Sequence, residues 1–368
     1  MRIRRGFGFD RFSGLYLWAV LIVAFSVWQS EFRTIATAHT VAGERSISAI
    51  LGLAIIIPLA CGAFDLSVGA IANFATINAV IFINNGYSWP VAAVFAVLIS
   101  VVIGVVNGFF VVRLHVSSFI TTLGIGSVIT ALQVVFTDNT QPVQPGSVSW
   151  SNFTNFTVFG FQIVFFYMLA LAVVLWWVLQ HTPVGRYLYA IGSSPEAARL
   201  AGVRVNRFTW LSLIASATVA GIGGVMFGSL TGPSLTYGSG LLLPAFAAAF
   251  LGSTQIIPGR FNVWGTVMSI FVLATGVEGL QLAYPSAQWL DPMFSGAALV
   301  LAVAIAVGRQ RAGEERTRKR LSRRRGPTDQ LPVSVDHPDS PGDHERSPGA
   351  IAQPAQHSHA DDTEGALQ

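Results

Sequence analysis

The sequence contains few of the groups on which enzyme chemistry depends. Its 368 residues include one lysine, Lys319, and Arg318 precedes it. A phosphate-binding loop of the GxxxxGK type needs a lysine after a glycine, so this chain cannot hydrolyse ATP by that route. The motifs HExxH, CxxC and GxSxG are also absent. We therefore predict that the chain is not an enzyme, has no catalytic residue and binds no cofactor of its own. Any energy from ATP must come from a partner chain.

Charged residues and cysteine are scarce as well. Charged residues make up 11% of the chain and hydrophobic residues 52%, whereas soluble domains contain roughly 25% charged residues. The single cysteine, Cys61, excludes an intramolecular disulfide framework and is expected to be a small buried apolar residue. This composition predicts an all-α polytopic membrane protein, with no nucleic acid among its partners.

What the chain does contain is a series of apolar runs, each close to the roughly 20 residues that a helix needs to cross a bilayer. No small-residue cleavage site follows the first run, so we interpret it as a retained span. Pro58 predicts a kink in the second. The ten predicted spans are residues 11–30, 46–64, 66–83, 89–112, 118–137, 159–180, 208–230, 241–257, 263–282 and 289–308.

The distribution of basic residues predicts the orientation. With a cytoplasmic N-terminus, all basic residues except Arg33 and Arg45 fall in segments on the cytoplasmic side. The positive-inside rule requires such an imbalance, and one span more or fewer before the central loop would remove it. Both termini are therefore expected in the cytoplasm. The cytoplasmic segments are residues 1–11, 113–117, 181–207, 258–262 and 309 onward.

The two ends of the chain differ from the membrane domain, which we place at residues 12–308. Residues 1–11 form a basic N-terminal segment, and residues 309–325 form a basic segment that we expect to meet anionic lipid head groups. Residues 326–368 are rich in Pro, Ser, Asp, His and Gly, and are expected to be disordered because they cannot bury a core. No metal site is expected from the scattered histidines of this tail.

The central loop, residues 181–207, is the long polar interruption in the middle of the chain, and it contains a predicted short helix. Ser194 is suited to cap this helix, Pro195 to its first position, and Glu196 to the positive end of the helix dipole. Gly202 is a plausible stop after it. A helix this short is marginal in water, so the residues alone leave open whether it is a plain connector or rests on a partner. Its candidate docking residues are Ser194, Pro195, Glu196, Ala197, Ala198, Arg199 and Gly202.

Polar residues inside the predicted spans are few. Asp65 lies at the junction of the second and third spans, where it could shape a translocation path or serve as a cap or structural hydrogen-bond acceptor. A stripe of small residues in the seventh span, from Ser212 to Gly232, predicts close helix packing rather than a binding site. The candidate residues of the path, or of structural polar contacts, are Asp65, Ser67, Asn73, Asn107, Ser118, Thr121, Thr122 and Glu278.

Several of these segments together resemble the membrane-spanning permeases of bacterial ABC importers for monosaccharides, the ribose-permease family. The resemblance covers roughly residues 13–308. Its motifs are residues 62–69 (GAFDLSVG), Asn107-Gly108, residues 115–124 (HVSSFITTLG), residues 182–202, which include Glu196 to Gly202 (EAARLAG), and residues 261–266 (FNVWGT).

This resemblance implies that the helix at Glu196 is a coupling helix seated in a cleft of ATPase subunits, which bind the ATP and magnesium. It also implies an extracytoplasmic sugar-binding protein and a second permease copy, as a homodimer or with a close paralogue. The expected location is the cytoplasmic (inner) membrane of a bacterium. The expected activity is sugar import by alternating access.

The sequence departs from the family pattern at two places. Leu242 and Pro244 replace two acids of the eighth span, and Ser117 and Ser118 replace a pair of prolines, which leaves the substrate open. The alternative is an ion-coupled secondary transporter of a small polar solute. It would need a coupling-ion site, for which Asp65 and Glu278 are the acids available.

Overall fold

The computed structural model describes residues 9–287, 289–305 and 308. The chain divides into a unit of residues 1–316 and a unit of residues 317–368, and the second lies outside the described residues. The basic N-terminal residues 1–8, the basic segment 309–325 and the tail 326–368 are therefore expectations about parts of the chain that the structure does not describe.

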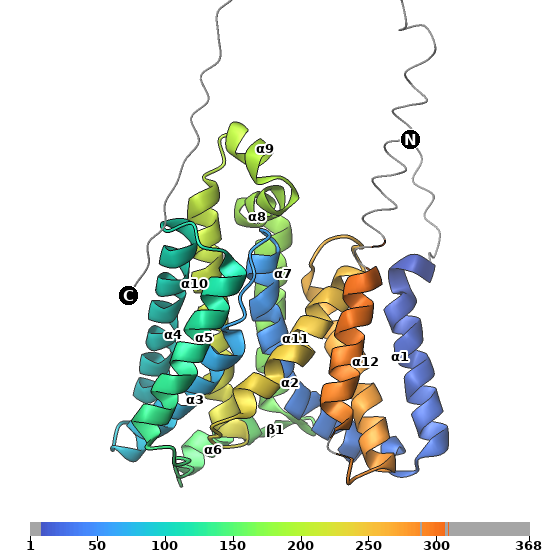
Figure 1. Ribbon diagram of the computed structural model, residues 1–368. Coiled ribbons are helices and arrows are strands. Elements are labelled where there is room, and N and C mark those ends of the chain that lie inside the picture. The colour runs from blue at the N-terminus through green and yellow to red at the C-terminus, as the bar shows by residue number, and fades with distance from the viewer. Residues whose placement is uncertain (1–8, 288, 306–307, 309–368) are drawn as a thin grey trace, which may run out of the picture. The chain divides into compact units, whose positions relative to one another are not determined.

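The described chain is built almost entirely of helices (Figure 1). Its elements are α1 (Phe9–Trp28), η1 (Glu31–Arg33), α2 (Ile35–Leu59), α3 (Val68–Asn84), α4 (Trp89–Val112), α5 (Ser118–Thr137), α6 (Val148–Asn155), β1 (Thr157–Val158), β2 (Phe161–Gln162), α7 (Ile163–His181), α8 (Pro183–Ser193), α9 (Pro195–Leu200), α10 (Val205–Leu230), α11 (Tyr237–Ser253) and α12 (Val263–Ala283). A further helix covers Leu290–Ile305.

Six of these helices, α2, α4, α5, α7, α10 and α12, are long and apolar enough to cross a membrane. Four shorter apolar helices accompany them within the described residues: Gly14–Trp28 in α1, α3, Gly240–Ser253 in α11, and Leu290–Ile305. Each predicted span overlaps one of these helices, and six of the helices have the length and composition of membrane spans, as expected for a helical polytopic membrane protein.

Residues 31–45, which lie between the first two predicted spans and were expected to form a polar loop, are helical for most of their length. Helix α2 begins at Ile35, where the Thr34 hydroxyl accepts a hydrogen bond from the Thr37 amide at 3.2 Å. The helix also ends at Leu59 rather than at residue 64, so Pro58 lies in the last turn instead of kinking a continuing span. Arg45, which was expected in this loop, therefore lies inside α2.

Two further predicted loops contain regular structure. Helix α6 and an antiparallel hairpin, β1–β2, occupy residues for which we expected a loop and the start of the sixth span. Helix α8 occupies the first half of the central loop and buries Leu188 and Ile191, which are 3% and 1% exposed. The helix propensity of this segment is weak because it contains Gly185 and Gly192. The helix is stabilised by burial against the bundle rather than by its own propensity.

Helix α10 lies inside the bundle and packs against α2, α3 and α4. The predicted small-residue stripe lies on this packed face, since Ser212, Ser216, Ala220, Gly224 and Gly228 are all buried. A Cβ on Gly224 would lie 2.0 Å from the carbonyl oxygen of Ala72, so only glycine allows α10 to approach α3 this closely. Gly232 lies after the end of α10.

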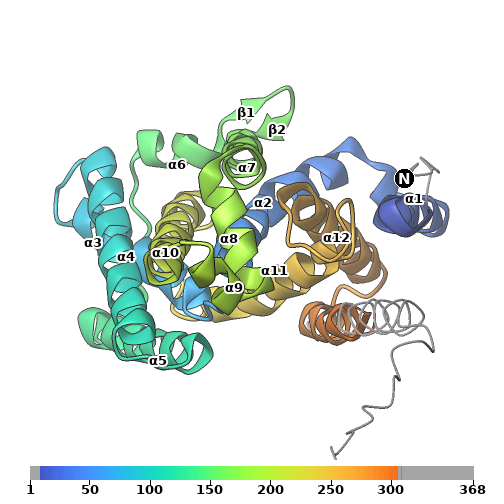
Figure 2. The ribbon, with the colours of Figure 1, turned by 90° about the horizontal axis from the view of Figure 1, so that it is seen from above.

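Other helices lie on both sides of α10 (Figure 2). Viewed along the bundle, α3, α4 and α5 lie on one side and α1 and α12 on the other, with α2, α10 and α11 between them (Figure 2). Outward-facing apolar side chains such as Val102 on α4 and Val135 on α5 are 60% and 67% exposed. Apolar side chains on the outside are what a helical protein presents to lipid.

Candidate functional site

Helix α9 lies at one tip of the described structure, with α8 beneath it (Figure 1). Ser194 is its N-cap, and its hydroxyl accepts a hydrogen bond from the Ala197 amide at 3.2 Å. Pro195 and Glu196 lie in the first turn, as the sequence predicts. Ala198 is buried at 5% exposure, whereas Arg199 and Leu200 face outward, Leu200 at 91% exposure.

The end of α9 is fixed by its backbone. Gly202 has φ of +82°, its amide donates to the Arg199 carbonyl at 3.0 Å, and the Val203 amide donates to the Ala198 carbonyl at 3.0 Å. These two bonds form a Schellman motif. This motif requires a left-handed backbone conformation, which glycine adopts without strain. The helix is therefore capped at both ends, although it has only six residues.

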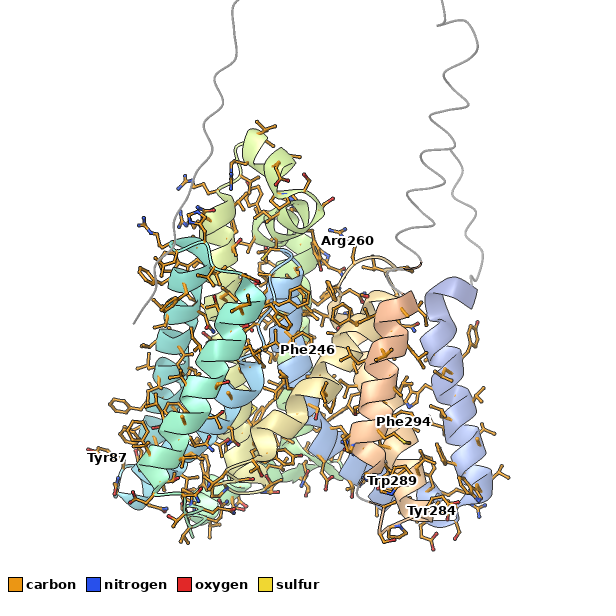
Figure 3. The ribbon with its side chains drawn as sticks, in the orientation of Figure 1. Tyr87, Phe246, Arg260, Tyr284, Trp289 and Phe294 are labelled. Atoms are coloured by element: carbon orange, nitrogen blue, oxygen red, sulfur yellow. The ribbon has the colours of Figure 1, made fainter. Side chains whose placement is uncertain are left out.

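Helix α8 fastens this tip to the bundle. The hydroxyl of Tyr189 donates to the Phe261 carbonyl at 2.6 Å, and the guanidinium of Arg260 lies 4.0 Å from the centre of the Tyr189 ring. Figure 3 shows Arg260 beside this end of the bundle. Burial raises the pKa of the Tyr189 phenol, and the charge of Arg260 opposes that rise. The ring and the cation thus join α8 to the connection between α11 and α12.

A backbone contact links α8 to the end of α2. A Cβ added to Gly192 would lie 2.4 Å from the Ala60 carbonyl oxygen, and one on Gly62 would lie 3.7 Å from the Gly192 Cα. The segment between α2 and α3 therefore lies directly against α8. A movement of α8 would displace the segment between α2 and α3, because closely packed backbones leave no free space between them.

The junction between α2 and α3 contains a completely buried polar pair, Asp65 and Ser67. Asp65 is 0% exposed, and its Oδ1 accepts hydrogen bonds from the Ser67 amide at 3.1 Å and the Ser67 hydroxyl at 2.5 Å. Asn107, on α4, donates from Nδ2 to the Ser67 hydroxyl oxygen at 2.8 Å. Asp65 Oδ1 is thus a hydrogen-bond acceptor at the junction, whereas its buried Oδ2 has no hydrogen-bond partner among the described residues.

Two hydroxyl groups of α5 hold the same junction from the other side. The Ser118 and Thr122 hydroxyl oxygens accept hydrogen bonds from the amides of Phe64 and Leu66, at 3.0 and 2.9 Å. Thr121, which precedes Thr122 in the chain, is also buried. Its Oγ1 has no hydrogen-bond partner among the described residues. We call Asp65, Ser67, Asn107, Ser118 and Thr122 the junction cluster. Five of the eight candidate path residues therefore meet in one place.

Asn73 belongs to a different contact. Its Nδ2 donates to Gln133 Oε1 at 2.8 Å and to the Leu235 carbonyl at 3.2 Å, and its Oδ1 accepts from the Gly238 amide at 3.3 Å. Gln133, on α5, donates to the same Leu235 carbonyl at 2.8 Å. The pair holds the start of α11 against α3 and α5. Gln133 is not among the candidate path residues, although an amide in an apolar span signals an interhelical hydrogen bond.

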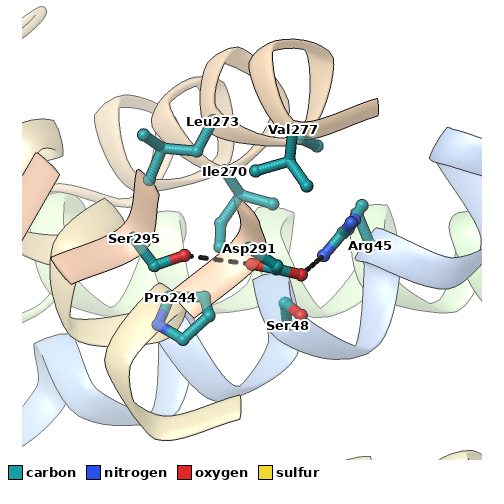
Figure 4. A pocket seen from close by; sticks show the side chains of 9 residues that line it. Arg45, Ser48, Pro244, Ile270, Leu273, Val277, Asp291 and Ser295 are labelled. Carbon is teal, nitrogen blue, oxygen red and sulfur yellow. Dashed lines mark hydrogen bonds and ion pairs between the residues drawn. The ribbon is translucent and has the colours of Figure 1, made fainter. Parts of the chain in front are cut away.

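Glu278 lies apart from the junction cluster, close enough to Arg45 and Glu44 for their charges to act on it. Arg45 forms an ion pair with Asp291 at 3.0 Å, and the Ser295 hydroxyl donates to the other oxygen of Asp291 at 3.1 Å (Figure 4). We call Arg45, Glu278, Asp291 and Ser295 the ion-pair cluster.

A small cavity adjoins the ion-pair cluster. Its volume is about 10 Å³, and Pro244, one of the residues that departs from the family pattern, is in its lining (Figure 4). That is room for about one water molecule, not for a sugar. Asp65 and Glu278 are thus in separate clusters, which gives no support to the paired acids that an ion-coupled transporter would need. Among the described residues, no group of three or more His, Cys, Asp or Glu side chains could hold a metal ion.

Comparison with known proteins agrees with this architecture. Residues 38–303 match the sequence model of a family described as "Branched-chain amino acid transport system / permease component". The matched segment contains both polar clusters, α8 and α9.

Individual relatives match over most of their length. An autoinducer 2 import system permease protein of Photorhabdus luminescens is 29% identical over 79% of this chain and 87% of its own length. A fructose import permease protein of Rhizobium meliloti is 29% identical over 77% of this chain and 81% of its own. A ribose import permease protein of Escherichia coli is 28% identical over 72% and 83%, respectively. By its match over residues 38–303 and by these relatives, the chain belongs to this family of membrane-spanning permease components of import systems.

Proposed function

We propose that the chain is the membrane-spanning subunit of an ABC importer for a monosaccharide or a related sugar or polyol. The names of its relatives support a sugar, since they specify autoinducer 2, fructose and ribose. The chain itself has no phosphate-binding loop, so paired ATPase subunits bind the ATP and magnesium. A second permease copy and an extracytoplasmic sugar-binding protein complete the transporter, in the inner membrane of a bacterium.

One observation carries this proposal: the contact path from α9 to the junction cluster. The capped tip of α9 is exposed, α8 lies beneath it, and Gly192 of α8 meets the backbone of Ala60, five residues before Asp65. An ATPase that moves α9 can therefore move the segment that joins α2 to α3. Ser194, Pro195, Glu196, Ala197, Ala198, Arg199 and Gly202 form the docking element, and the junction cluster lies at the other end of the path.

The transport cycle then follows from two conformations of the spans. ATP closes the paired ATPases and thereby biases the α8–α9 element toward one conformation, while sugar delivered from outside biases the other. Each ligand can shift the equilibrium only by the difference between its affinities for the two states. In this proposal Asn73 and Gln133 hold the start of α11 against α3 and α5. The junction cluster holds the start of α3 against α4 and α5, so that each helix start moves together with the helices bonded to it.

The proposal is tested by purifying the chain with the ATPase and binding protein encoded beside it. We expect the chain alone to show no ATPase activity, the ATPase to co-purify with it, and the complete system to import one of radiolabelled ribose, fructose or autoinducer 2. A chain that fails to retain any ATPase, and that instead takes up solute in response to an ion gradient, would refute the proposal in favour of secondary transport.

The proposed topology has ten spans with both termini in the cytoplasm, and a reporter experiment tests it separately. A reporter fused after Gln368 should be cytoplasmic, and one inserted at Ser149, which lies in α6 at the end opposite α9, should be periplasmic (Figure 1). Two reporters on the same side of the membrane would contradict the number of spans.

A further inference from the structure

The β1–β2 hairpin lies at the end of the bundle opposite α9, outside α7 (Figures 1 and 2). Its two turn residues are Phe159 and Gly160, with φ of +52° and +84°, between strands paired in the register Val158 to Phe161. A two-residue turn with positive φ at both positions favours Asn or Gly. A phenylalanine in the left-handed region is strained, because its Cβ crowds the backbone.

Nothing within the described structure compensates this strain. Phe159 is 91% exposed, and its ring stacks on no other described aromatic ring. The adjoining Phe156 is 55% exposed. A residue in a disfavoured conformation whose large apolar side chain is also left in the open indicates a contact outside the chain.

The hairpin is nevertheless held firmly in place. The Phe161 ring meets His39 of α2 at 4.4 Å between centroids, and the Ile163 amide donates to the Phe156 carbonyl at 2.7 Å. Asn155 Nδ2, just before the hairpin, donates to the Ser229 carbonyl at 3.2 Å. These contacts with α2, α7 and α10 present Phe159 from a fixed base.

The segment around the hairpin indicates which kind of environment Phe159 contacts. No Asp, Glu, Lys or Arg occurs from residue 139 to residue 185, so this part of the chain offers no charge to a protein partner. Helix α7, which follows the hairpin directly, exposes Val174 and Trp177 at 56% and 57%. Both residues lie in the half of α7 that leads to α8, and α7 is long enough to span a membrane.

The same end of the bundle carries exposed aromatic side chains elsewhere on its perimeter. Tyr87, Tyr284 and Trp289 are 51%, 55% and 60% exposed, and all three lie at the end opposite α9 (Figure 3). Tyr and Trp side chains collect at the level of lipid head groups, because their rings are apolar and carry a polar group. The hairpin that carries Phe159 lies at the same end of the bundle (Figure 1).

We propose that the β1–β2 hairpin is a membrane anchor, with Phe159 and Phe156 inserted into the interfacial region of the adjoining lipid leaflet. Insertion removes the Phe159 ring from water and offsets the strain of its left-handed backbone. The anchor fixes the depth of one end of α7, the helix whose other end leads through Thr182 into α8. This proposal goes beyond the transport function and does not depend on the substrate or the ATPase.

The test compares Phe159→Cys with Leu200→Cys, each carrying a nitroxide label, in the full-length permease in lipid nanodiscs. The two positions are a matched pair, because both side chains are 91% exposed and they lie at opposite ends of the structure. Unsubstituted protein gives the labelling background, since its Cys61 is buried at 5% exposure. The measurement is the collision rate of each label with oxygen, which concentrates in lipid, and with a water-soluble nickel chelate.

We expect the label at Phe159→Cys to collide mainly with oxygen and the label at Leu200→Cys mainly with the nickel chelate. The protection should be the same in nanodiscs of neutral and of anionic lipid, because the hairpin segment has no charge. A label at Phe159→Cys that is as accessible to nickel as the one at Leu200→Cys would overturn the proposal. Protection that requires anionic lipid would also overturn it, since it would show electrostatic attraction rather than apolar insertion.

Discussion

The two polar clusters, one just after the end of helix α2 and one in its first half, are held together in different ways. The junction cluster follows the end of α2 and consists of hydrogen bonds around a buried carboxyl group, with no basic side chain bonded to it. The ion-pair cluster lies in the first half of α2, where Arg45 and Asp291 are 17% and 30% exposed. The junction cluster is joined through Ala60 and Gly192 to α8, whereas the ion-pair cluster joins α2 to the helix Leu290–Ile305. The junction cluster is therefore placed to transmit a movement of α8, and the ion-pair cluster is placed to hold two helices together.

The largest effect should come from removing one member of the ion pair. Arg45→Leu leaves the Asp291 carboxylate partly buried without its cation, which should lower the free energy of unfolding by roughly 3 kcal/mol, the lower end for broken buried pairs, because the pair is partly exposed. The double variant Arg45→Leu with Asp291→Leu should regain most of that loss, since no charge is left unpaired. Thermal unfolding in detergent measures both. Equal losses in the single and double variants would show that packing, not charge, joins these helices.

A smaller effect is expected at the junction cluster. Asp65→Ala removes the acceptor of two hydrogen bonds from Ser67 and should cost about 2 kcal/mol. Asp65→Asn keeps an acceptor oxygen at the same place and introduces no unpaired charge, so it should unfold within about 1 kcal/mol of the unsubstituted protein.

The comparison of Asp65→Asn with Asp65→Ala also tests the contrast between the clusters. If Asp65→Asn is as damaging as Asp65→Ala in unfolding and in sugar uptake at matched expression, then the negative charge of Asp65 is required. The two clusters would then both be electrostatic, contrary to the geometry.

The third prediction concerns the tip that is joined to the junction cluster. Gly202→Val places a β-branched residue at φ of +82°, where no neighbour lies within 4 Å of the added Cβ, so the cost is the backbone strain of roughly 1–2 kcal/mol. The permease should stay folded in the membrane but retain less ATPase in a pull-down and take up less sugar. Combined with Arg45→Leu, its effect on unfolding should be additive, because the two sites share no contact. Pull-down and uptake equal to the unsubstituted protein would show that the central loop is only a connector.

The smallest expected effect on stability is at Glu196. Glu196→Lys places a cation at the positive end of the α9 dipole, which is unfavourable by roughly 0.3–1 kcal/mol. We expect ATPase retention and uptake to fall more than thermal stability does, because the exposed side chain faces the proposed partner. Glu196→Gln is the matched control, and its ATPase retention and sugar uptake should lie between those of Glu196→Lys and the unsubstituted protein. A Glu196→Lys variant that unfolds early but still binds the ATPase would contradict a docking role.

Local signals in the sequence were sufficient for α9 and for the helical spans. The cap at Ser194, the proline after it and the left-handed Gly202 are decided by neighbouring residues within one turn, so the sequence predicts both ends of α9. The same holds for the apolar helices, whose existence follows from runs of about 20 apolar residues. Their boundaries were less predictable, as the early start of α2 at Ile35 shows, because capping competes with composition there.

Contacts between distant segments were not predictable in this way. The sequence singled out Asp65, Asn107, Ser118 and Thr122 one by one, but only the packing of α4 and α5 on the junction brings them together. The sequence places Arg45 only between two predicted spans and does not indicate its partner, because Asp291 is 246 residues away. Helix α8 was missed for the same reason, since its stability depends on burial.

The sequence by itself therefore determined that the chain is an apolar helical protein with a short capped helix in its central loop, because composition and capping act over a few residues. Only the tertiary structure decided which polar groups share a cluster, that α8 carries α9 against the end of α2, and that Phe159 is left exposed on a hairpin. These features depend on pairs of segments that are far apart in the chain. Their approach is set by shape, through glycine at Gly192 and Gly224 and through side chains that find hydrogen-bond partners on other helices.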